Sequence, residues 1–100
     1  MTYSKIIEAI DAHLAKSSKQ YYKDFYIGIA SDARDRLFSD HGVDEKSDWW
    51  IYGTADNDQI ARDVERYYLD QGMLGGQGGG DENTKMVYCY EVSEHTHEDR

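Results

Sequence analysis

Hydrophobic residues in the first part of the chain recur at the spacing of an amphipathic helix. Between Thr2 and about Lys16 the apolar side chains lie three or four positions apart, and charged side chains occupy the opposite side. The apolar positions are Tyr3, Ile6, Ile7, Ile10 and Leu14. This pattern predicts a helix that packs one face against a core and ends before Ser17 and Ser18.

The period changes to two after Tyr22, as in a strand with two different faces. One face carries Phe25, Ile27 and Ile29, and the other carries Tyr26, Gly28 and Ala30. Ser31 and Asp32 follow, and both residue types commonly cap helices. We therefore expect a strand that ends near residue 30 and a short helix from Ala33 to about Asp40, closed by the His-Gly pair at 41–42.

The rest of the chain predicts two more strands and a longer helix. The run Trp-Trp-Ile-Tyr at 49–52 has high strand propensity. Asp56, with Gln59 three positions later, has the form of a capping box and predicts the start of a helix. Gly72 stands where a C-cap glycine would end that helix. Alternation from 86 to 92 predicts a last strand, with Met86, Tyr88, Tyr90 and Val92 on one face and Val87, Cys89 and Glu91 on the other.

These elements follow one another in the order α-β-α-β-α-β, without proline or an internal repeat. One hundred residues suffice for a single core. We expect an α/β (α+β) fold, with a small three-stranded, mostly antiparallel sheet flanked by about three helices. The domain is expected to span residues 1–92, and residues 93–100 to form a polar, frayed tail.

Charge and composition restrict the classes of partner. Eleven Lys and Arg residues stand against 20 Asp and Glu residues, which gives a formal net charge of −9. This balance excludes a pervasively basic nucleic-acid-binding surface and a polybasic membrane patch. No apolar run approaches the roughly 18 residues of a membrane span. The single cysteine, Cys89, and the absence of a signal-peptide pattern lead us to expect a cytoplasmic protein.

The segment from Tyr26 to Leu37 carries the most specific chemical signal. Tyr26 and Gly28 share one strand face, and the missing side chain at Gly28 leaves space for a ligand or another backbone to approach. Arg36 follows one helical turn after the predicted cap, where its planar fork of donors suits a phosphate group. The pattern predicts a phosphate-binding site at the junction of strand and helix.

This segment resembles the YIG half of the GIY-YIG nuclease family, in which a Tyr-Ile-Gly strand is followed by an arginine on the next helix. Glu65, on the predicted helix after Asp56, is the candidate for the family's metal-binding glutamate. The resemblance implies a divalent-metal-dependent hydrolysis of phosphodiesters. Tyr26 would orient or activate water, Arg36 would steady the phosphate charge, and Glu65 would bind magnesium or manganese.

Three further residues are candidates for contact with the substrate. Gly28 leaves the space described above, and Arg34 lies on the same predicted helix as Arg36. His41 lies close to the position at which many members of the family have a histidine. We expect Gly28, Arg34 and His41 to bind the substrate.

The GIY half of the family motif is missing before Tyr26, since residues 19–24 are too few for the usual first strand and turn. Tyr21 or Tyr22 is one replacement for the missing tyrosine. The other is the last predicted strand, which would supply Tyr88 from the far end of the chain, as in a circular permutation. Tyr88 is then the second catalytic tyrosine.

Ordinary helix ion pairs also account for two of the candidate residues. Arg36 has Asp32 and Asp40 four positions away on either side, and Glu65 has Arg62 three positions before it. The alternative function is therefore a catalytically silent domain on the same scaffold, whose acidic surface binds a basic protein partner. The net charge opposes a nucleic-acid partner unless the basic residues are focused near the YIG-like segment.

A glycine-rich segment precedes the last strand. Six of the nine residues between Gly72 and Gly80 are glycine, which predicts an irregular loop. The segment lacks the Lys and Ser or Thr that end a nucleotide-binding loop, and acidic residues follow it instead. We expect a loop that turns tightly or covers a site, and not a nucleotide-binding loop.

Overall fold

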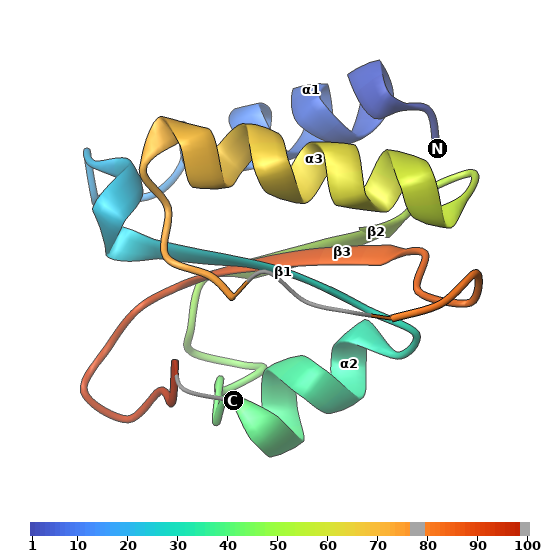
Figure 1. Cartoon of the computed structure of the whole chain (residues 1–100). Helices are drawn as coiled ribbons and strands as arrows, with labels where there is room; N and C mark the ends of the chain where they lie inside the picture. The colour runs from blue at the N-terminus through green and yellow to red at the C-terminus, as the bar shows by residue number, and fades with distance from the viewer. Residues whose placement is uncertain (77–79, 99–100) are drawn as a thin grey trace.

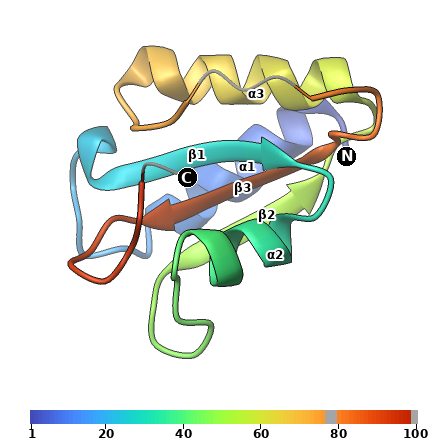
Figure 2. The ribbon, with the colours of Figure 1, turned by 60° about the horizontal axis from the view of Figure 1, so that its bottom comes forward.

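A three-stranded antiparallel sheet forms the middle layer of the protein (Figure 1). The computed structural model describes residues 1–76 and 80–98. In that part of the chain the strands are β1 (Phe25–Ala30), β2 (Trp50–Thr54) and β3 (Met86–Glu91), in the spatial order β1-β3-β2 (Figure 2). The expected α+β fold with a small antiparallel sheet is confirmed.

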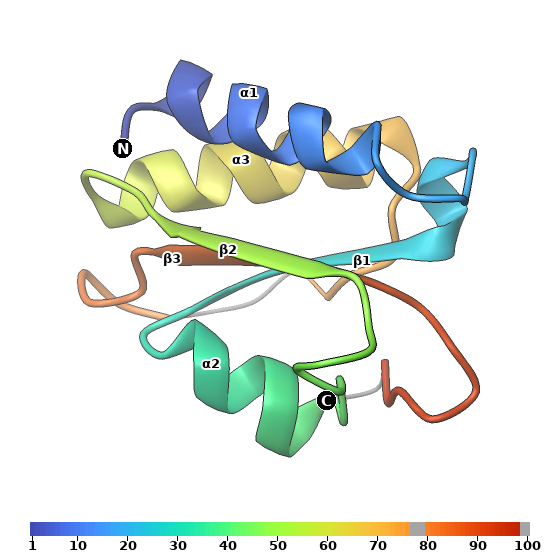
Figure 3. The same cartoon turned by 180° about the vertical axis from the view of Figure 1, so that it is seen from behind.

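Helices cover both faces of the sheet. On one face lie α1 (Tyr3–Leu14) and α3 (Asp58–Gln71), side by side across the strands (Figure 3). On the other face lies α2 (Ala33–Asp35), which continues into a π-helical turn, η2 (Arg36–Asp40). A short 3₁₀ turn, η1 (Tyr22–Asp24), leads into β1.

The alternation of side chains along β1 and β3 produces two separate cores, as the sequence pattern predicts. The core under α1 and α3 includes Phe25, Ile27, Ile29, Val87 and Cys89. The core on the α2 side includes Tyr26, Ala30, Leu37, Tyr88 and Tyr90. Every residue of β1 is buried, because helices or loops cover both of its faces.

The start of α3 differs by one residue from the prediction. Asn57, not Asp56, is the N-cap: its side-chain oxygen accepts a hydrogen bond of 2.8 Å from the Ile60 backbone N–H. Asp56 instead pairs with the amino group of Met1 at 2.8 Å. The helix therefore begins at Asp58, because only the side chain of residue 57 reaches an otherwise unpaired N–H of the first turn.

Replacement of this cap distinguishes the two residues. We expect Asn57→Ala to lower the free energy of unfolding by about 1 kcal/mol, since the Ile60 N–H loses its acceptor. Asp56→Ala removes only an exposed ion pair and is expected to cost about 0.5 kcal/mol or less. Urea denaturation followed by circular dichroism measures both. A larger loss for Asp56→Ala would contradict this assignment of the cap.

The predicted short helix from Ala33 to about Asp40 is confirmed, but its second half is a π turn. After one α-helical turn, the His41 N–H donates to the carbonyl of Arg36 at 2.9 Å, five positions back instead of four. Such a π turn inserts an extra residue, and here it carries His41 into the core beneath the sheet. Gly42 follows with φ of +71°, a backbone conformation that favours glycine.

The C-terminal segment is not frayed over residues 93–98. Thr96 is only 7% exposed, and its hydroxyl exchanges hydrogen bonds with the backbone of Ser93. The His97 N–H donates to the carbonyl of His41 at 2.8 Å, which fixes the segment on the α2 side of the sheet. Its polar residues are ordered because they bond to one another and to the loop before β2, a pairing that no local periodicity reveals.

Candidate active site

A cavity of about 420 Å³ opens beside the C-terminal half of β1, where α2, α3 and the loop before β3 meet. Five of the seven residues predicted for the site line this cavity. They are Tyr26, Gly28, Arg36, Glu65 and Tyr88. Gly76 and Gly80 line it as well, so the glycine-rich loop borders the cavity at both of these positions, while residues 77–79 lie outside the described residues.

Tyr88 reaches the cavity because β3 pairs with β1. Gly28 lies opposite Tyr88 in the antiparallel register, and a Cβ at position 28 would overlap the Tyr88 ring. The ring therefore occupies the space that the glycine leaves, and it stacks against Tyr26 with 6.3 Å between ring centroids. The space above Gly28 is therefore filled by the Tyr88 ring, and Gly28 also lines the cavity.

Of the alternatives for the second tyrosine, only Tyr88 is at this cavity. Tyr21 and Tyr22 line a different hollow of about 300 Å³, between the end of α1 and the start of β1. Tyr88 comes from a strand that lies directly beside the Tyr-Ile-Gly strand and pairs with it antiparallel.

His41 lies behind Tyr88 and is fully buried, so it does not meet a ligand in the cavity directly. Its Nδ1 lies 2.6 Å from the His97 carbonyl oxygen, and its Nε2 lies 2.8 Å from the Tyr88 hydroxyl. A carbonyl oxygen only accepts hydrogen bonds, so Nδ1 carries the proton and Nε2 accepts from Tyr88. Burial lowers the pKa of His41 and keeps the ring neutral. The expected contact of His41 with substrate is replaced by a contact with Tyr88.

Glu65 brings a carboxylate to the cavity from the opposite side of the sheet. The residue is 7% exposed, and burial raises its pKa to about 7, although Arg62 opposes this shift. Among the described residues its carboxylate makes no hydrogen bond or ion pair, and Arg62 pairs with Asp58 instead, at 3.8 Å. A helix ion pair therefore does not account for Glu65, whose charge is costly at this position unless a cation joins it.

Arg36 lines the cavity and also forms the predicted ion pair, with 3.0 Å between its Nε and an oxygen of Asp40. Arg34, in contrast, lies outside the cavity. Its guanidinium pairs with Glu45 at 2.6 Å and lies over the ring of Phe38. Two positions correspond to about 200° around a helix, so the two arginines point to nearly opposite sides.

The residues of the cavity fit a mostly hydrated divalent cation better than a closed metal cage. No group of three His, Cys, Asp or Glu residues suited to a metal ion occurs within the described ranges 1–76 and 80–98. Glu65 offers one carboxylate with no protein partner there, and magnesium commonly keeps several waters and takes one or two carboxylates together with substrate phosphate. The cavity is therefore suited to a cation held by Glu65 and a bound phosphate.

The sequence pattern indicates only part of the polar surroundings of Tyr88. Tyr90 and Glu98 lie behind it, with the Tyr90 hydroxyl donating to Glu98 at 2.9 Å. The alternation of the last strand places Tyr90 on the same face as Tyr88, so the sequence pattern indicates that the two tyrosines are neighbours. Nothing local in the polar tail indicates that Glu98 returns to the core.

No protein-family model, curated protein or solved structure matches this chain. Within residues 1–76 and 80–98, no helix has the length and apolar character needed to cross a bilayer.

Proposed function

We propose that the protein is a divalent-metal-dependent nuclease with a circularly permuted GIY-YIG-like arrangement. One observation carries the proposal: residues 26, 36, 65 and 88, which the resemblance selects from distant parts of the chain, all line one cavity. The antiparallel pairing of β1 with β3 supports the permutation, because it places the two tyrosine-bearing strands side by side.

In this proposal the chain moves a proton from water towards the buried histidine. As the oxygen of a water molecule bonds to phosphorus, its proton passes to the Tyr88 oxygen, and the Tyr88 proton passes to Nε2 of His41, which lies 2.8 Å away. The bond from phosphorus to the leaving oxygen breaks, and that oxygen takes a proton from solvent. Burial raises the pKa of Tyr88, so its hydroxyl stays protonated until His41 accepts the proton.

Charge in the cavity supports a requirement for a metal ion. Three carboxylates line it, from Asp32, Asp35 and Glu65, against the guanidinium of Arg36. A phosphodiester would meet net negative charge there unless a cation is present. Magnesium or manganese at Glu65 would supply that charge and polarise the phosphoryl oxygens, while Arg36 would neutralise the charge that develops on them.

Hydrolysis assays on a matched pair of arginine variants test the proposal. With Mn²⁺ or Mg²⁺ the protein is expected to cleave plasmid, single-stranded or branched DNA, or bis(p-nitrophenyl) phosphate, and EDTA is expected to abolish the activity. Arg36→Ala is expected to lower kcat by about 100-fold or more. Arg66→Ala removes an exposed arginine from α3 and is expected to stay within about threefold of the unchanged protein.

Three outcomes would contradict the proposal. Hydrolysis that persists in EDTA would remove the metal from the mechanism, and equal activity of the two variants would remove Arg36. Absence of hydrolysis with both metals and all four substrates would favour the silent, acidic protein-binding domain. That alternative predicts binding to basic proteins and no metal-dependent binding to DNA.

A further inference from the structure

A line of hydrogen-bonded groups extends from the cavity through the core to the C-terminal segment. The Tyr88 hydroxyl lies 2.8 Å from Nε2 of His41, and Nδ1 of His41 lies 3.1 Å from the Tyr90 oxygen. The Tyr90 hydroxyl donates to Oε2 of Glu98 at 2.9 Å. Four side chains from three separate segments of the chain thus form one continuous path.

The direction of the hydrogens along this path is determined by its two ends. Glu98 only accepts when ionised, so the Tyr90 hydrogen points at Glu98 and the Tyr90 oxygen faces the Nδ1–H of His41. That N–H is shared with the His97 carbonyl at 2.6 Å. The Nδ1–H of His41 thus has two acceptors, the His97 carbonyl oxygen and the Tyr90 oxygen. The first belongs to the segment 93–98, and the second is polarised by Glu98 of the same segment. Both acceptors stabilise positive charge on the imidazole ring.

Other charged groups around His41 partly cancel. Arg36 disfavours a proton on the ring, and Asp40 favours it, but these two form an ion pair with each other. The rings of Tyr26, Tyr88 and Tyr90 pack against His41 and carry no charge while they are protonated. Among the residues that the structure describes, Glu98 also favours a proton on His41, and it joins the hydrogen-bonded path.

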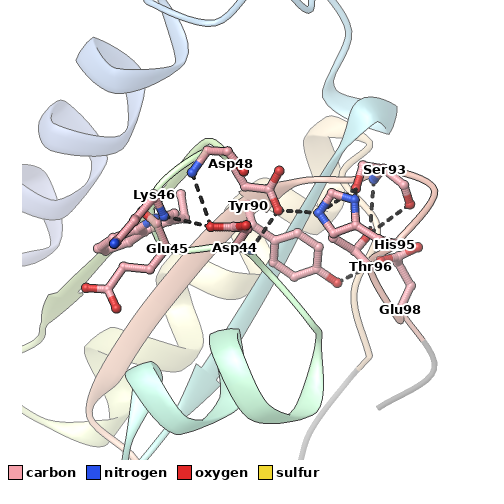
Figure 4. Close-up of polar contacts among 11 residues, drawn as sticks. Asp44, Glu45, Lys46, Asp48, Tyr90, Ser93, His95, Thr96 and Glu98 are labelled. Carbon is pink, nitrogen blue, oxygen red and sulfur yellow. Dashed lines mark hydrogen bonds and ion pairs between the residues drawn. The ribbon is translucent and has the colours of Figure 1, made fainter.

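Several contacts hold the segment that carries Glu98 in place. An oxygen of Asp48 lies 2.5 Å from Nε2 of His95, which ties the segment to the loop before β2 (Figure 4). The hydrogen bonds between Ser93 and Thr96 close a turn just before Glu98 (Figure 4). Glu98 is thus placed at Tyr90 by folded structure and not by chance contact of a loose end.

We propose that Glu98, acting through Tyr90, is a positioning residue that makes His41 a stronger proton acceptor for Tyr88. The catalytic meaning of this role rests on the proposed nuclease function. The structural part does not, because it concerns how readily His41 takes a proton. A carboxylate that orients and supports a histidine through its far nitrogen is a general way of strengthening a base.

The test compares two glutamines in the same segment. Glu98→Gln keeps the shape of the side chain and removes its charge, and Glu94→Gln removes an equal charge from an exposed position outside the path. Protein labelled with ¹⁵N-histidine gives the protonation midpoint of His41 by NMR. We expect that midpoint to fall by roughly half to one pH unit in Glu98→Gln and to stay unchanged in Glu94→Gln. Tyr90→Phe, which breaks the path in the middle, is expected to lower it as Glu98→Gln does.

An unchanged His41 midpoint in both Glu98→Gln and Tyr90→Phe would overturn the proposal, as would an equal shift in Glu94→Gln. In the active protein, Glu98→Gln is expected to lower kcat by about three- to tenfold at constant KM, and to move the acidic limb of the pH profile by the same shift as the NMR midpoint. If the unchanged protein hydrolyses nothing, the proposed function fails, and the NMR titration still decides the role of Glu98.

Discussion

Replacing Gly28 with alanine is expected to destabilise the protein by about 3 kcal/mol and to remove Tyr88 from its place in the cavity. The added Cβ would overlap the Tyr88 ring, which is almost fully buried and packs against the rings of Tyr26 and His41. A forced displacement of a packed aromatic ring typically costs 1–3 kcal/mol or more. The displaced hydroxyl would also leave Nε2 of His41, which adds the loss of a buried hydrogen bond. Urea denaturation measures the stability, and NMR of the His41 ring reports the lost contact.

Gly76→Ala is the matched control, because a Cβ at that position meets nothing within 4 Å. We expect it to change stability by about 0.5 kcal/mol or less. A double-mutant cycle then assigns the cost to Tyr88: in a Tyr88→Ala background, Gly28→Ala should become nearly neutral. If Gly28→Ala costs the same in both backgrounds, the overlap with Tyr88 is not the cause.

Replacing Glu65 with glutamine is expected to stabilise the protein by about 3 kcal/mol at about pH 8 and by less than about 1 kcal/mol at about pH 5. Burial raises the pKa of Glu65 to about 7 in the folded state, above the ordinary value of 4.5 for an unfolded chain. Between these two values the folded state binds more protons, so the free energy of unfolding falls as pH rises. Glutamine cannot ionise and escapes this loss. Urea denaturation at the two pH values gives the difference.

A control variant and a metal titration complete this experiment. Glu82→Gln removes the same charge from an exposed position and is expected to show no such pH dependence. Mn²⁺ is expected to stabilise the unchanged protein at about pH 8 through binding to the folded state, and to stabilise Glu65→Gln much less. Equal stabilisation of both proteins by Mn²⁺ would place the metal elsewhere.

The strands and helices could be predicted because burial imposes a period on them. Phe25, Ile27 and Ile29 face one core and Tyr26 faces the other, as their alternation indicates. The helix that ends at Gly72 ends there because the glycine takes φ of +115°. Details that depend on which donor a side chain reaches were not predictable in the same way. The shift of the cap from Asp56 to Asn57 changes one hydrogen bond and leaves the hydrophobic pattern intact.

The candidate site was predictable only in part, for a similar reason. Spacing along the chain selected Tyr26 and Arg36, but the choice between Tyr88 and the earlier tyrosines depends on the pairing of β1 with β3, a long-range contact. Helical geometry alone predicts that Arg34 and Arg36, which are about 200° apart around a helix, do not point into the same cavity. The burial of His41 depends on the π turn, and its partners depend on the returning C-terminal segment, and neither leaves a periodic signal.

The position of β3 has a consequence for how the chain is synthesised and matures. Among the described residues, β3 follows β1 and β2 in the sequence but is the middle strand in space, so β1 and β2 hydrogen-bond to it and not to each other. A nascent chain on the ribosome therefore has no sheet to form while residues 86–91 are still inside the exit tunnel. The helices can form during translation, but we expect both cores and the cavity to assemble in one late step, when β3 inserts between β1 and β2.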